Sequence, residues 1–332
     1  MKTPPQHGGR LQAAAEQFNI PESDWLDLST GINPTSWDVP AIPPSVWQRL
    51  PDNYAQLEAA AAEYYQAPVM AIPGSQWAIQ NLPLAVKTRR VWLPQQAYEE
   101  HQYWWEQSQN DIKLYESLTA IKAKPFDSVV VINPNNPSGH SDSPDHLCEL
   151  AISLQAQQGY LVLDEAFMDP TPEQSVFFQH RDLPDNMIVL RSLGKFFGMA
   201  GLRLGFIYCQ QPIRSLLQHM LGPWAISHPA SYLGELALRD RDWQQTAIKE
   251  LRHKSEQLHR LLENHVDVSS ICSTRLFSTL QLSPEAAESL FKHCAQQGIL
   301  LRHFPQWGKI RVGLTTKSGR ERLQSALECW DI

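Results

Sequence analysis

The chain has 332 residues and a formal net charge of −7, and its positive residues are scattered rather than gathered in a basic run. This charge argues against a nucleic-acid or anionic-membrane partner. Its five cysteines form no Cys-x-x-Cys pair, so we expect neither a disulfide framework nor a bound metal. The N-terminus lacks the apolar core of a signal peptide and no apolar stretch approaches a membrane span, so we expect a cytoplasmic protein.

The chain is expected to form an N-terminal arm and two domains. The arm, residues 1–35, begins with His7-Gly8-Gly9 followed by a short helix-like run, and we expect it to act as a lid that packs with the smaller domain. Residues 36–232 should form a large domain. Residues 233–332, which open with a long helical run and continue with short apolar strands, should form a small α+β domain.

The large domain is predicted to be α/β. Short apolar strands alternate with helical segments from Pro68 to Cys209, which indicates a mainly parallel sheet. One crossover helix is well marked, because Ser143 can cap it, Pro144 stands in its first turn and Gly159 follows it. In such sheets, ligands collect at the carboxyl ends of the strands.

Three polar residues follow apolar strands in this domain: Asn136, Asp164 and Lys195. The set suits pyridoxal 5′-phosphate (PLP), an electron sink for which a protein supplies a Schiff-base lysine and an acidic partner for the pyridinium nitrogen. Asp164 would keep that ring protonated, because a nearby opposite charge favours the charged form. Asn136 can donate to the phenolate oxygen, and Lys195 would later move protons at the substrate's alpha carbon. A lone lysine is normally a solvated surface residue, so the interpretation depends on the order of the three.

Two segments could hold the cofactor's phosphate. Ser192 and Arg203 flank the lysine in a glycine-punctuated loop, and they offer a hydroxyl and a two-pronged donor. The segment Gly74-Ser75-Gln76 is typical of a loop that leads into a helix N-terminus, where free N–H groups and the helix dipole bind phosphate. A Gly-Ser pair alone is common in turns, but its position before the three strand ends supports the assignment.

These motifs resemble the fold-type I PLP-dependent enzymes of the aspartate aminotransferase superfamily, nearly end to end. The resemblance is carried by Asn-Pro-Asn-Asn-Pro-Ser-Gly from Asn133, Asp-Glu-Ala-Phe from Asp164 and Ser-Leu-Gly-Lys from Ser192. It implies the PLP-dependent transferase-like fold and a homodimer with active sites at the subunit boundary. It also implies that Tyr98 stacks on the cofactor ring, although a core aromatic would read the same way.

The opening His-Gly-Gly and the stretches Trp25 to Pro34 and Leu221 to Ser227 resemble, within this superfamily, the threonine-phosphate decarboxylases of cobalamin biosynthesis. The resemblance implies that L-threonine O-3-phosphate loses CO2 to give (R)-1-amino-2-propanol O-2-phosphate. Arg311 falls where family members place the arginine for the alpha-carboxylate, and Arg302 would be a second anionic anchor. Two such arginines suggest a small phosphorylated amino acid as substrate.

The remaining expected substrate contacts come from the arm and from the cofactor loop. We predict that the arm closes over the substrate, the alternative being a flexible tail with an ordinary turn. The expected residues are His7, Gly8, Thr30, Gly31 and Asn136.

Two other functions stay open. A histidinol-phosphate-type aminotransferase would share every cofactor residue, and a non-catalytic PLP-binding protein is a rival of another class. Phe167 stands where histidinol-phosphate aminotransferases usually carry a tyrosine that bonds the cofactor phenolate, so Asn136 would act there alone or with another donor. Leu50 replaces a tyrosine that reaches the partner's phosphate in many relatives, and Tyr54 is a possible substitute.

Overall fold

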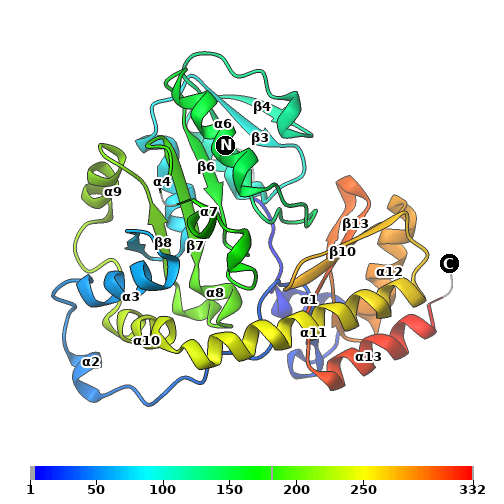
Figure 1. The fold of residues 1–332 in the computed structure, drawn as a ribbon. Helices are drawn as coiled ribbons and strands as arrows, with labels where there is room; N and C mark the ends of the chain where they lie inside the picture. Colours follow the sequence, from blue (N-terminus) through cyan, green and yellow to red (C-terminus); the bar gives the residue numbers. More distant parts are fainter. Residues whose placement is uncertain (1–3, 181, 331–332) are drawn as a thin grey trace. The chain divides into compact units, whose positions relative to one another are not determined.

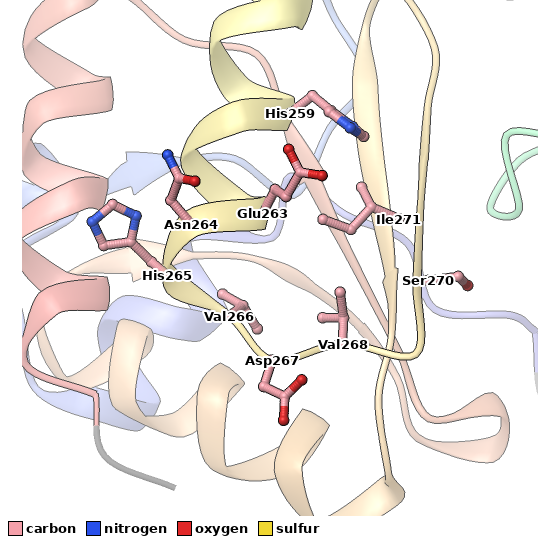
Figure 2. A pocket seen from close by; sticks show the side chains of 9 residues that line it. All are labelled: His259, Glu263, Asn264, His265, Val266, Asp267, Val268, Ser270 and Ile271. Atoms are coloured by element: carbon pink, nitrogen blue, oxygen red, sulfur yellow. The ribbon is translucent and has the colours of Figure 1, made fainter.

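The protein, described here by a computed structural model over residues 4–180 and 182–330, divides into two compact units (Figure 1). The first unit consists mainly of Ser36–Asn136 and His140–Gln245. The second is assembled from Gln6–Thr35, Pro137–Gly139 and Thr246–Ile332. Each unit has its own sheet.

A seven-stranded sheet in the order β2-β8-β7-β6-β5-β3-β4 forms the centre of the first unit. β8 runs antiparallel to both of its neighbours and the other pairs are parallel, which confirms the predicted mainly parallel α/β fold. The central strands are buried on both faces and read as continuous apolar runs, as parallel strands do. The bounds are β2 Met70–Ile72, β3 Arg90–Pro94, β4 Asp111–Tyr115, β5 Asp127–Ile132, β6 Leu161–Asp164, β7 Met187–Ser192 and β8 Gly205–Tyr208.

Helices cover this sheet on both faces. Apolar side chains of α4, α5 and α9 join those of the strands in one buried cluster. The α6 helix packs against β6 (Figure 1). The α6 helix is capped as expected, since the Ser143 hydroxyl accepts from the His146 N–H, and Gly159 has no room for a side chain against the Asp127 carbonyl. The helices of this unit are α2 Pro44–Gln48, α3 Ala55–Tyr65, α4 Ser75–Ala85, α5 Glu99–Gln107, α6 Pro144–Gln155, α7 Val176–Gln179, α8 Leu193–Phe196, α9 Ile213–Leu221 and α10 His228–Arg239, with 3-10 turns η2 Leu118–Ala120, η3 Pro172–Gln174 and η4 Ala200–Leu202.

The second unit contains a four-stranded antiparallel sheet in the order β12-β13-β10-β9. Residues 6–35 of the arm belong to this unit: β1 pairs with β11, and Ala14 and Trp25 share a buried cluster with Ala295 and Leu300. Among the described residues, no helix is both long and apolar enough to cross a membrane. The bounds are α1 Leu11–Phe18, η1 Glu22–Asp24, β1 Leu26–Asp27, α11 Arg241–His265, β9 Ser270–Ser273, β10 Phe277–Gln281, α12 Pro284–Gln296, β11 Ile299–Leu300, β12 Arg302–Phe304, η5 Pro305–Trp307, β13 Lys309–Gly313 and α13 Lys317–Glu328.

The division between the units lies later in the chain than we predicted. We expected the small domain to begin at residue 233, whereas the second unit begins again at Thr246, inside α11. The α10 helix stays with the first unit because it packs against α3. The start of α11 stays there too, since the Trp243 ring stacks on Phe197 with centroids 5.5 Å apart. These contacts involve side chains far apart in sequence, which the local pattern could not indicate.

Candidate active site

The three polar residues expected at strand ends lie on adjacent strands of the first unit. Asp164 is the last residue of β6, opposite Ile132 of β5 on one side and Leu190 of β7 on the other. Asn136 follows β5, and Lys195 lies in α8, directly after β7. The carboxyl ends of three neighbouring parallel strands therefore carry the amide, the carboxylate and the amine.

Asp164 is held by two donors. Its Oδ1 accepts the Ala166 N–H at 3.0 Å, and its Oδ2 lies 3.0 Å from His101 Nε2, with both side chains buried. A carboxylate can only accept a hydrogen bond, so Nε2 carries the proton of that pair. His101 was not predicted from the sequence. It lies in the first turn of α5, where its ring also contacts that of Tyr98, with centroids 6.4 Å apart.

The Lys195 amine lies near an aromatic ring. Its Nζ is 5.4 Å from the centroid of Phe167, a distance at which a cation is attracted to the face of a ring. Phe167 is buried and carries no hydrogen-bonding group, so it contacts the lysine where a tyrosine was expected from the relatives. The ring therefore offers an apolar wall to Lys195.

A second cluster forms at the N-terminus of α4. Gly74 is the N-cap with φ of +81°, and a Cβ there would lie 3.0 Å from Nη2 of Arg203. Ser192 pairs with Gly205, and a Cβ at Gly205 would lie 2.7 Å from the backbone nitrogen of Ser75. A guanidinium and the first N–H groups of an uncapped helix thus lie close together, with the backbone of Ser192 nearby, and guanidinium and N–H groups are donors for a phosphate.

We expected Gln76 to contact the cofactor's phosphate, but its side chain bonds Glu100 and Tyr98 instead. Its Nε2 donates to Glu100 Oε2 at 2.6 Å, while its Oε1 accepts the Tyr98 hydroxyl at 3.2 Å. Trp104 Nε1 donates to the same Glu100 oxygen at 2.7 Å. Because Glu100 can only accept, it fixes the amide with its oxygen toward Tyr98. Gln76 therefore orients the aromatic residue, and the assignment of its backbone N–H to the phosphate stays a prediction.

A buried ionic cluster lies behind the strand ends. Arg191 of β7 donates to Glu165 at 2.5 Å and also to Asp169, and all three are at most 1% exposed. Ser175 donates to the same Glu165 oxygen at 2.5 Å. Burial raises the pKa of both carboxyls, and Arg191 opposes that rise. Glu165 follows Asp164 and Arg191 precedes Ser192, so the cluster fixes two of the strand ends.

The two expected substrate arginines lie opposite one another in the second unit. Arg302 of β12 and Arg311 of β13 are cross-strand partners. Nη2 of Arg311 donates to the Ser29 carbonyl at 2.6 Å, and Nη2 of Arg302 donates to the Gln6 carbonyl at 2.6 Å. Both arginines therefore hold the arm.

The expected arm residues gather beside these arginines. Gly8 packs against the backbone of Ser29, later in the arm, so a Cβ at Gly8 would lie 2.4 Å from the Ser29 carbonyl oxygen. Likewise, a Cβ at Gly313 of β13 would lie 2.1 Å from the Thr30 carbonyl oxygen. The structure thus brings the arm segments that carry Gly8, Thr30 and their neighbours His7 and Gly31 to the β13 side of this sheet, whereas Asn136 belongs to the first unit.

Tyr54 does not have a spare hydroxyl for the role of the missing tyrosine. Its oxygen donates to the Ile226 carbonyl at 3.1 Å and accepts the Ile226 N–H at 3.0 Å. Leu50 is 63% exposed. The geometry argues against Tyr54 as the substitute that we considered.

The residues of the first unit fit the cofactor expected from the sequence. PLP needs an amine for its aldehyde, a buried carboxylate for its ring nitrogen and donors for its phosphate. Lys195, Asp164 and the cluster of Gly74, Ser75 and Arg203 provide these groups in one unit. No side chain caps the N-terminus of α4, and the Arg203 guanidinium lies beside its N-cap, so a positively charged group and helix N–H groups are available to an anion.

The chain belongs to the class I and II aminotransferase family, whose model matches residues 23–327. Its sequence relatives carry a more specific name than the family does. The chain is 40% identical, over 97% of both chains, to a threonine-phosphate decarboxylase of Pseudomonas aeruginosa, and 38% identical, over 98% of both, to one of a Sinorhizobium species. The fold matches the histidinol-phosphate aminotransferase of Sinorhizobium meliloti solved in complex with pyridoxal-5′-phosphate, with a TM-score of 0.79, 18% identity and coverage of 98% of this chain and 94% of that one. The family resemblance seen in the motifs is confirmed.

Proposed function

We propose that this chain is a PLP-dependent decarboxylase that converts L-threonine O-3-phosphate to (R)-1-amino-2-propanol O-2-phosphate in cobalamin biosynthesis. The observation that carries the proposal is the 40% identity to a threonine-phosphate decarboxylase over 97% of both chains. That match extends beyond the cofactor residues to the arm and the small unit, which hold the expected substrate anchors.

The cofactor residues have separate tasks. Bound PLP supplies the electron sink for the pair left by the broken Cα–carboxylate bond. Lys195 would hold the cofactor through Nζ and later bring a proton to Cα. Asp164, oriented by His101, would face the ring nitrogen and favour its protonated form. Tyr98 would cover the ring, and Asn136 would donate to the phenolate oxygen.

The phosphate of the cofactor would be held by Gly74, Ser75, Ser192 and Arg203. The assignment is supported by their convergence at the start of α4. Arg203 contributes a planar donor pair and the helix contributes backbone N–H groups, so the anion would be fixed from two directions. These residues would thereby keep bound PLP in one orientation.

Arg302 and Arg311 would bind the two anionic ends of the substrate. Like charges directly opposite one another destabilise a sheet, so their cross-strand pairing favours an anion beside them. Loss of CO2 would require the substrate carboxylate to be held in a fixed orientation, and these arginines would supply that hold. His7, Gly8, Thr30 and Gly31 would complete the substrate site and exclude water.

The oligomeric state and the location of the protein are further proposals. The family resemblance supports a homodimer, and the sequence pattern supports a cytoplasmic enzyme. Size-exclusion chromatography with light scattering tests the first, and cell fractionation tests the second.

The deciding experiment measures CO2 against keto acid. The purified protein with PLP is incubated with L-threonine O-3-phosphate, with and without 2-oxoglutarate, and a Lys195→Ala variant serves as the control. We expect CO2 release that needs no 2-oxoglutarate and is lost in the variant. Keto acid formed with 2-oxoglutarate, without CO2, would overturn the proposal in favour of an aminotransferase.

Borohydride reduction followed by peptide mapping tests the covalent assignment separately. We expect the reduced cofactor to be found on Lys195. A tag on another side chain would contradict this part of the mechanism, whatever the product assay shows.

A further inference from the structure

A three-residue segment, Pro137–Gly139, belongs to the second unit. It directly follows Asn136, and the residues on either side of it belong to the first unit. Its own contacts are with the second unit. Because one peptide bond joins Asn136 to Pro137, the contacts of this segment also constrain the position of Asn136.

The segment is held at both ends. The Thr279 hydroxyl of β10 donates to the Pro137 carbonyl at 2.6 Å, and both residues are buried. At the other end, Gly139 has φ of +76°, and a Cβ there would lie 2.9 Å from Sγ of Cys272. A hydroxyl and a close backbone approach thus tie the segment to β10 and β9.

Thr279 stands in the same row of the sheet as the substrate arginines. Across the strands it is opposite Arg311 of β13 on one side and Cys272 of β9 on the other, and Arg302 is the next partner beyond Arg311. Residues directly opposite one another in an antiparallel pair share a face. One row therefore carries both arginines and the anchor of the segment that follows Asn136.

We propose that Thr279 is a positioning residue, which holds Pro137 and, through the peptide bond that follows Asn136, keeps the cofactor's expected phenolate donor in place. The proposal rests on the function proposed above for Asn136. Without the hydroxyl, the buried Pro137 carbonyl loses the donor that Thr279 supplies. The segment, and Asn136 beside it, would then be less firmly positioned.

The test compares three variants of the full chain. Thr279→Val removes the hydroxyl and keeps the shape, Thr279→Ser restores a hydroxyl, and Ser278→Ala is the matched control. Ser278 is also buried on β10, but its hydroxyl bonds Ser273 on the opposite face. Hydrogen exchange of the peptide around Pro137 is measured for each, with the thermal midpoint as a check of folding.

We expect exchange in that peptide to be faster by about threefold to tenfold in Thr279→Val, the factor for one lost hydrogen bond. Thr279→Ser and Ser278→Ala should exchange like the natural protein. The visible absorbance of bound PLP should also change in Thr279→Val alone, and kcat should fall more than KM rises. Unchanged exchange in Thr279→Val, or equal loss in Thr279→Ser, would overturn the proposal.

The exchange measurement separates this proposal from the function on which it rests. Faster exchange in Thr279→Val, together with a natural protein that releases no CO2, would leave the anchor standing and remove the decarboxylase. If the natural protein releases CO2 but exchange is unchanged in Thr279→Val, the decarboxylase proposal stands and the role of Thr279 is refuted.

Discussion

Replacing Arg191 with methionine should destabilise the first unit strongly. The change leaves the Glu165 and Asp169 carboxyls, which are at most 1% exposed, without their shared cation. Removing one partner of a buried ion pair costs about 3–5 kcal/mol, because the other charge stays buried. In a domain of this size each kcal/mol lowers the melting temperature by about 2–4 °C, so we expect a fall of about 6–20 °C.

The pH dependence of this loss has a definite sign. Burial raises the pKa of both carboxyls and Arg191 opposes the rise, so the variant's carboxyls should have a pKa that is higher still in the folded state. A carboxyl with a raised folded-state pKa weakens the fold as the pH rises through that value. The difference in melting temperature should therefore be smallest at acidic pH and should grow toward neutral pH.

Differential scanning calorimetry of the natural protein and the variant, over a series of buffers, measures both effects. Arg239→Met is a suitable control, because Arg239 pairs with Glu235 at the surface of the same unit, where an ion pair contributes less than about 1 kcal/mol. A difference near that of the control, or one that does not change with pH, would refute the reasoning.

Three further predictions concern single contacts. His101→Phe removes a donor from the buried Asp164 carboxylate, so equilibrium dialysis should show PLP bound about tenfold more weakly, and unchanged binding would contradict the pairing. In Glu100→Gln the Gln76 amide that orients Tyr98 is no longer fixed by a carboxylate. The visible circular dichroism of bound PLP should therefore weaken, with little change in melting temperature. An identical spectrum would count against the bonds from Glu100 through Gln76 to Tyr98. Gly8→Ala places a Cβ 2.4 Å from a backbone oxygen, so limited proteolysis should cut the arm about fivefold faster, and an unaltered rate would mean that the arm tolerates the shift.

The sequence was sufficient to predict the fold class and the strand ends. Continuous apolar runs ended at Asp164 and before Asn136, and a helix with its own cap lay between them. These are local signals, since strand ends and caps are marked by neighbouring residues. The predictions that depended on them agree with the observed elements.

The contacts between distant segments could not be predicted in the same way. His101 meets Asp164 across 63 positions, and Glu100 fixes Gln76 across 24. A histidine or a glutamate on a helix is usually solvated, and nothing in the neighbouring sequence marks His101 or Glu100 as buried. The start of the second unit depends on the same kind of contact, because Trp243 belongs to the first unit through a ring 46 positions away.

The bond between Thr279 and the Pro137 carbonyl spans 142 positions, and this has a consequence during synthesis. The ribosome completes the entire parallel sheet before β10 is made. Until β10 emerges, the Pro137 carbonyl lacks the donor that Thr279 provides. A nascent chain would therefore form its central sheet early and complete the loop after Asn136 only late in translation.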